Sequence, residues 1–110
     1  MPNSILDDTV TYVNATKHYH ADSFYVEAKG RSMEGAGIKE GMRLLIDKTI
    51  EHTNGRIVLA CVDGEYTVKR LKTNGKIWLL HPDSDIGMPI IEVTKDVEII
   101  GVVVRLELNL

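Results

Sequence analysis

The chain has 110 residues, enough for one hydrophobic core and too few for two, so we expect a single folded domain. It carries 13 Lys and Arg against 16 Asp and Glu, which gives a formal net charge of −3. Because phosphate binding needs a basic patch, this balance excludes a nucleic-acid surface, and we expect no direct DNA binding by this segment.

The single cysteine, Cys61, lies within an apolar run, which predicts a small buried side chain without a disulfide. No stretch approaches the roughly 20 apolar residues of a membrane span, and no secretory signal is recognisable. We therefore expect a cytoplasmic protein without membrane association.

Residues 1–22 show no sustained hydrophobic period and predict an N-terminal arm, with a partial strand around residues 10–13. His18 and His20 lie in this arm, but no cysteine or third close histidine accompanies them. We therefore expect no metal site there. The predicted folded domain covers residues 23–110.

The first strand of this domain is predicted over residues 23–29, where aromatic and β-branched residues precede a turn at Gly30. A short helical turn follows from Met33, because the glycines after it prevent a long helix. A polar loop is predicted over residues 81–87. Further apolar runs predict strands over residues 43–48, 56–63, 65–72, 76–80, 89–93 and 97–108.

Two turn dipeptides connect three of these strands in succession. Asp63-Gly64 suits a type I′ turn, in which both central residues need a positive φ, and Asn74-Gly75 is a similar pair. No amphipathic stretch is long enough for a stable helix, so the sequence predicts a mostly β domain without a helix-turn-helix. The last strand, residues 97–108, is almost continuously apolar, which predicts burial on both faces, either within the sheet or across a dimer.

The turn after the first strand contains a candidate nucleophile, Ser32. A serine hydroxyl attacks a carbonyl only after a base removes its proton. Gly30 permits an unusual backbone conformation, so the N–H groups of Arg31 and Ser32 could converge on an oxyanion. Met33 would then form an apolar wall beside the nucleophile.

The strand over residues 65–72 contains a candidate base, Lys69. Alternation places Thr67, Lys69 and Leu71 on one face, while Arg70 is expected to reach solvent from the other. A lysine acts as a base only when neutral, and burial lowers the pKa of such an amine. On residue types alone, a turn serine and a solvated strand lysine remain the simpler interpretation.

Three segments together resemble a known family. They are Gly30-Arg31-Ser32-Met33, Gly35-Ala36-Gly37-Ile38 and the run from Asp63-Gly64 through Thr67-Val68-Lys69-Arg70-Leu71. Their motifs and spacing resemble the LexA/UmuD family of self-cleaving serine peptidase domains, over residues 24–106. The resemblance implies that Ser32 is the nucleophile and Lys69 its general base.

The resemblance also implies a compact, curved, barrel-like β ribbon with short helical turns, which forms a homodimer and needs no cofactor. Family members cleave themselves at an Ala-Gly or Cys-Gly bond upstream of the serine, stimulated by the RecA filament. No such pair precedes Ser32 here, and Ala36-Gly37 follows it too closely to reach the site. We therefore do not expect this polypeptide to cleave itself.

Two further departures concern Gly41-Met42 and Gly55-Arg56, where family members usually have Gly-Asp. We expect these changes to alter surface contacts and not chemistry.

Three functional interpretations follow from the resemblance. The first is a processed UmuD-like protein of the SOS response, a dimer that supports an error-prone, UmuC-type translesion polymerase. The alternative is the dimerisation and autocleavage domain of a LexA-like or phage-type repressor, which would contact operator DNA through a separate N-terminal domain. A third interpretation is a related domain with an inactive Ser–Lys pair that serves only as an interaction module.

Overall fold

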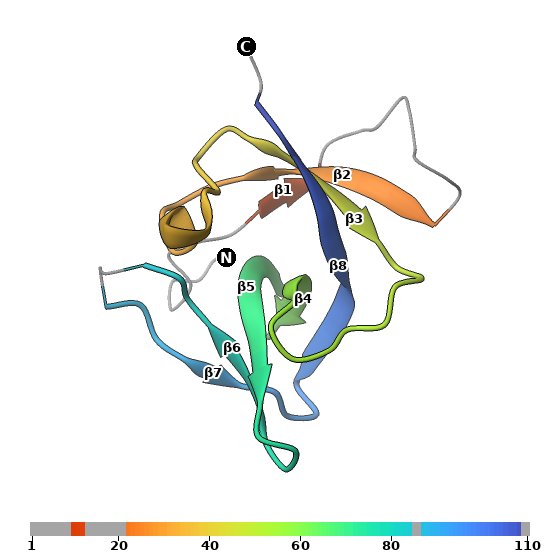
Figure 1. The fold of residues 1–110 in the computed structure, drawn as a ribbon, viewed down its shortest axis with the longest axis vertical. Coiled ribbons are helices and arrows are strands. Elements are labelled where there is room, and N and C mark those ends of the chain that lie inside the picture. Colours follow the sequence, from red (N-terminus) through yellow and green to blue (C-terminus); the bar gives the residue numbers. More distant parts are fainter. Residues whose placement is uncertain (1–9, 13–21, 85–86, 109–110) are drawn as a thin grey trace.

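The computed structural model describes residues 10–12, 22–84 and 87–108. Its strands form one antiparallel sheet in the order β1-β2-β3-β8-β4-β5-β6-β7 (Figure 1). A single-turn 3₁₀ helix, η1, covers Glu34–Ala36. The strands are β1 (Val10–Tyr12), β2 (Ser23–Ala28), β3 (Arg43–Asp47), β4 (Ile57–Val62), β5 (Glu65–Thr73), β6 (Trp78–His81), β7 (Ile91–Glu92) and β8 (Val97–Glu107).

The last strand holds the two halves of the sheet together. β8 pairs with β3 on one side and with β4 on the other, so it separates β1-β2-β3 from β4-β5-β6-β7. Each pairing contains a register shift, one at Leu45/Ile46 and one at Leu59/Ala60, and such bulges bend and twist a sheet. Figure 1 shows β8 crossing the middle of the molecule between the two halves.

The prediction of a mostly β, compact and curved fold is confirmed, although the sheet stays open. β1 and β7 are its two edges, so among the described strands no ladder closes the sheet into a barrel. The predicted strands are found with shifts of one or two residues at their ends, and the partial strand near residues 10–13 is β1. The helical turn predicted from Met33 is η1.

The turn between β4 and β5 has the predicted type I′ character. Asp63 has φ 50° and Gly64 has φ 86°, which matches the positive φ that both central positions require. Among the described residues, no helix has the length and apolar character needed to cross a membrane.

The core consists of two clusters on opposite faces of β4. Leu59 and its neighbours on one face pack with Met33, Leu44 and Val68, whereas Val58 and Ala60 on the other face pack with the second cluster. Successive strand residues point to opposite faces, so a strand with apolar residues at every position is buried on both sides. The second cluster also contains Val62, Leu71, Leu80 and Val102.

Two burial predictions differ from the structure. Cys61 is half-buried, whereas its neighbours Ala60 and Val62 on the other face of β4 are buried. The two-sided burial of the last strand within the chain is wrong for its second half, where Val104, Leu106 and Leu108 are 37%, 38% and 69% exposed. Beyond Val102, β8 extends past β4 and pairs only with β3, so it has no core on that side.

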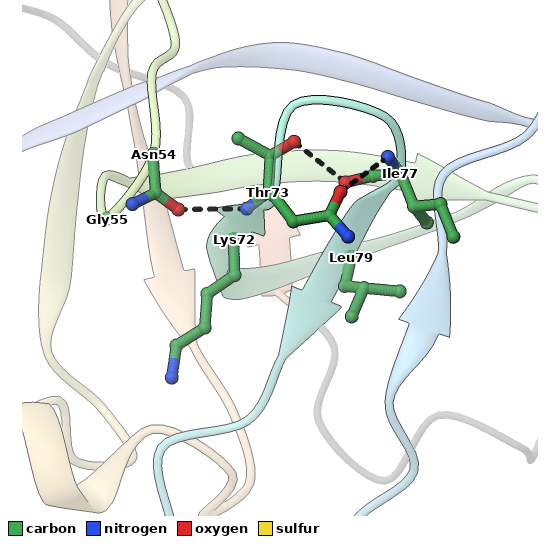
Figure 2. A pocket seen from close by; sticks show the side chains of 7 residues that line it. Asn54, Gly55, Lys72, Thr73, Ile77 and Leu79 are labelled. Atoms are coloured by element: carbon green, nitrogen blue, oxygen red, sulfur yellow. Dashed lines mark hydrogen bonds between the residues drawn. The ribbon is translucent and has the colours of Figure 1, made fainter.

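The β5–β6 hairpin is fixed by side-chain hydrogen bonds (Figure 2). Asn74 Oδ1 accepts from the N–H groups of Lys76 and Ile77 at 2.9 and 3.1 Å. The Thr73 hydroxyl donates to the Ile77 carbonyl at 2.7 Å, and the Thr73 N–H donates to Asn54 Oδ1 at 2.8 Å. The hairpin is thereby attached to the loop that precedes β4.

Gly101 lies where β8 crosses the end of β3, and we expect Gly101→Ala to destabilise the fold. An added Cβ would sit 2.8 Å from Ile46 Cγ2 and 3.0 Å from the Asp47 carbonyl oxygen. Overpacking of this kind costs about 1–3 kcal/mol, more than the roughly 0.5–1 kcal/mol that removing a strand glycine returns. Urea unfolding should show a lower free energy of unfolding for Gly101→Ala. The control Val104→Ala, at an exposed position, should stay close to wild type. An unchanged midpoint for Gly101→Ala would contradict the predicted clash.

Candidate active site

Ser32 lies in the turn that links β2 to η1. Gly30 has φ 86°, a left-handed conformation that lets the chain reverse directly after β2. Ser32 is fully buried and Met33 is 2% exposed, so the turn points its central side chains inward. Met33 joins the first core cluster, and its role as an apolar wall beside the nucleophile stays a prediction.

The Arg31 side chain points outward from the same turn. It pairs with Glu34 at 3.1 Å, and both side chains are largely exposed. The Arg31 carbonyl accepts a hydrogen bond from the Glu34 N–H at 3.2 Å, which starts η1. The oxyanion-hole role of the Arg31 and Ser32 N–H groups stays a prediction.

Lys69 lies in the middle of β5 and is 2% exposed, an uncommon position for a lysine. Its Nζ donates a hydrogen bond of 2.6 Å to Oγ1 of Thr67, which is fully buried on the same face. The cross-strand neighbours are apolar, since Val58 pairs with Lys69 and Ala60 pairs with Thr67. Burial among apolar groups disfavours an ammonium ion, so this setting favours the neutral amine.

Asp83, directly after β6, connects the Ser32 turn to β5. Its N–H donates to the Ser32 carbonyl at 2.7 Å, and its carbonyl accepts from the Gly35 N–H at 2.6 Å. Its carboxylate accepts from Arg70 Nη2 at 2.9 Å and from Nε at 3.3 Å. Because Arg70 follows Lys69 in β5, these contacts join the two segments that carry the predicted nucleophile and base.

Sequence reasoning gives Asp83 no role at the site, and although the Arg70 side chain does reach solvent in part, its bonds to Asp83 are not foreseen. Arg70 also donates to the Gly55 carbonyl at 2.7 Å, so its guanidinium is bound on two sides. An aspartate after Pro82 was the only local signal, and no spacing rule relates it to an arginine in an earlier strand.

The groove beside the β5–β6 hairpin is separate from the Lys69 face. It has a volume of about 530 Å³ and includes Lys72 and Leu79 in its lining. Figure 2 shows the Lys72 side chain on one side of this groove, and Ile77 and Leu79 on the other. Lys69 and Lys72 lie on opposite faces of β5, so this groove does not open onto the Lys69 amine.

Within residues 10–12, 22–84 and 87–108, no three His, Cys, Asp or Glu side chains gather in a way that could hold a metal ion. His18 and His20 lie outside the described residues. The donor groups at the predicted site are a hydroxyl, an amine and backbone N–H groups, which suit proton transfer and acyl chemistry.

The family comparison covers nearly the whole chain. The model of the "Peptidase S24-like" family matches residues 2–104. Curated relatives are named LexA repressor: the one from Glaesserella parasuis serovar 5 is 40% identical over 72% of this chain, and one from Actinobacillus pleuropneumoniae serotype 5b is 44% identical over 62%. The one from Haemophilus influenzae (strain PittGG) is 36% identical over 89% of this chain.

The matched regions make up 38%, 32% and 52% of these three relatives. The chain therefore spans about a third to a half of the length of the repressors it matches. The motifs around Ser32 and Lys69 and the match over residues 2–104 agree on the same assignment. The chain belongs to the Peptidase S24-like family, the LexA/UmuD family of self-cleaving peptidases.

Proposed function

We propose that this chain is a Ser–Lys peptidase domain that resembles the self-cleaving half of a LexA-like repressor and acts on an Ala-Gly or Cys-Gly bond supplied from outside this sequence. The observation that carries this proposal is the burial of Lys69 beside Thr67, in a strand joined through Asp83 to the turn of Ser32. A buried lysine is costly to retain without a role, and a neutral amine near a serine is a base.

The chemistry follows from these groups. Neutral Lys69 takes the proton from Ser32 Oγ as the oxygen attacks the scissile carbonyl carbon, and the Thr67 hydroxyl orients the amine. The N–H groups of Arg31 and Ser32 stabilise the negative charge that develops on the carbonyl oxygen. The Lys69 ammonium then protonates the departing amine, and water releases the acyl group from Ser32.

The names of the relatives favour the repressor interpretation over the processed UmuD-like one. They support a family role in the SOS response, with cleavage in the cytoplasm stimulated by the RecA filament and operator DNA contacted by a separate domain. The polymerase-accessory interpretation, with a UmuC-type partner, gains no support from these relatives, all of which are named LexA repressor.

The end of β8 supports a homodimer as part of this proposal. Val104, Leu106 and Leu108 are alternate residues, and all three are exposed. They form an exposed apolar segment, here called the apolar stripe, at the end of β8 and just after it, beyond the part that pairs with β4, and exposed apolar patches mark interaction sites. A second copy of the chain would cover the stripe.

Substituting either member of the proposed pair should abolish cleavage. Ser32→Ala removes the nucleophile, and Lys69→Met removes the base while filling nearly the same volume, so both variants should fold. The measurement is cleavage in trans of a peptide carrying an Ala-Gly bond, followed by mass spectrometry, with rates at least 100-fold below wild type expected for loss of a nucleophile or base. Lys72→Met, on the other face of β5, is the matched control. Wild-type turnover in Ser32→Ala would exclude the proposed mechanism.

The cleavage rate should rise with pH, because only neutral Lys69 accepts the serine proton. Below the pKa of the lysine, the fraction of neutral amine increases about tenfold per pH unit, and above it the rate levels off. Initial rates from mildly acidic to strongly alkaline pH, with circular dichroism to confirm folding at each pH, give the profile. A flat profile or a rate that falls on alkalinisation would show that another group is the base.

The two interpretations of cellular role differ in the proteins they retain. A tagged copy of the chain, recovered from DNA-damaged cells of its own source, should retain longer proteins that combine this domain with a helix-turn-helix. Mass spectrometry identifies the retained proteins, and a Leu106→Glu variant, which places a charge in the apolar stripe, controls for non-specific capture. Recovery of a translesion polymerase without such longer proteins would favour the UmuD-like interpretation instead.

A further inference from the structure

Asp83 is bound to both ends of the segment that presents Ser32. Its main-chain N–H holds the Ser32 carbonyl at 2.7 Å, and its main-chain carbonyl holds the Gly35 N–H at 2.6 Å. The two hydrogen bonds fix the chain at Ser32, just before η1, and at Gly35, within η1. The position of Ser32 is therefore coupled to the position of residue 83.

The Asp83 side chain in turn is fixed to β5. Arg70 reaches Oδ2 with both Nη2 and Nε, and its Nη1 donates to the Gly55 carbonyl at 2.7 Å. Charge-assisted bonds through two nitrogens of one guanidinium restrict orientation as well as distance. Arg70 is the neighbour of Lys69 in the chain, so its anchor point moves with the strand that carries the proposed base.

The close contact between Gly35 and the Asp83 carbonyl group leaves no room for a side chain at position 35. A Cβ at this position would lie 2.6 Å from the Asp83 carbonyl oxygen and 3.2 Å from its carbonyl carbon. Unlike Gly30 and Gly37, Gly35 does not have a positive φ, so its backbone conformation is open to other residues. The close approach to Asp83 is thus the reason that a side chain is excluded.

From these contacts we propose that Asp83, held by Arg70, is a positioning residue that sets the Ser32 turn against the strand of Lys69. This inference rests on the proposed Ser–Lys function and adds a residue to it. The ion pair is partly exposed, with the Arg70 and Asp83 side chains 29% and 38% accessible, so it adds little to global stability. Its effect is geometric, since small displacements between reacting groups reduce rates severely.

The test compares Asp83→Ala, Arg70→Ala and the double variant in the trans-cleavage assay. Each should lower kcat by about ten- to a hundredfold with little change in KM, and the double variant should be no slower than either single variant. Asp83→Asn keeps an acceptor for Arg70 and should recover part of the rate. Glu34→Gln, which breaks the exposed pair with Arg31, is the matched control and should keep the wild-type rate.

Amide hydrogen exchange gives a second measurement that does not depend on catalysis. The amide of residue 83 donates to the Ser32 carbonyl, and its protection factor should fall at least tenfold in Asp83→Ala and in Gly35→Ala. Amides in β4 should keep their wild-type protection, because the core clusters are not touched.

The outcomes separate this inference from the proposed function. Wild-type kcat together with unchanged protection in Asp83→Ala overturns the positioning role, whatever the activity of Ser32→Ala. A rise in KM with constant kcat in Asp83→Ala also overturns it, because that result would make Asp83 a substrate contact. If the wild-type chain cleaves no peptide, the proposed function fails, and the exchange data alone decide whether Asp83 fixes the turn.

Discussion

The buried amine of Lys69, on a strand with apolar cross-strand neighbours, is the constraint on which the rest of this structure depends. Removing an ammonium ion from water costs several kcal/mol unless hydrogen bonds and opposite charges compensate for the lost hydration. The strand that carries Lys69 must therefore be held firmly, or the side chain would swing out to solvent. β4 pairs with residues 65–70 of β5, which include Lys69, and β6 pairs with residues 70–73, so the two ladders together restrain the strand along its length.

The sheet order explains how this restraint extends to the turn of Ser32. That turn follows β2, on the opposite side of β8 from β5, so no ladder joins the two segments directly. Core packing of Met33 with Leu59 and Val68 connects the turn to the sheet, and the hydrogen bonds of Asp83 add a directional contact. Apolar packing brings the turn to the sheet without fixing its rotation, whereas directional hydrogen bonds at Asp83 fix its orientation.

The family of this chain is supported by a match along most of its length, whereas its cellular role is supported only by the names of longer relatives. The family match extends over residues 2–104, and the fold has the mostly β, compact architecture expected of the family. The relatives named LexA repressor are two to three times longer than the matched region, so what they do as whole proteins also involves parts outside that match. The chemistry proposed for Ser32 and Lys69 needs only residues within the chain, whereas DNA binding would need residues outside it.

The sequence by itself determined the strands, the type I′ turn at Asp63-Gly64 and the shared face of Thr67 and Lys69. These features depend on alternation and on the φ preferences of single residues, which act over a few positions. The resemblance carried by the motifs and their spacing added the family and the candidate nucleophile and base, and the alternation that places Lys69 between Thr67 and Leu71 on one face suggested an apolar setting.

Only the tertiary structure decided the insertion of β8 between β3 and β4, the exposure of Val104 and Leu106, and the bonds from Asp83 to Arg70 and Ser32. Each of these depends on contacts between segments far apart in the chain, whose partners are chosen by packing and sheet order and not by any neighbouring residue. A polar loop and a solvated arginine are the natural interpretation of Asp83 and Arg70 until the fold brings them within hydrogen-bond distance.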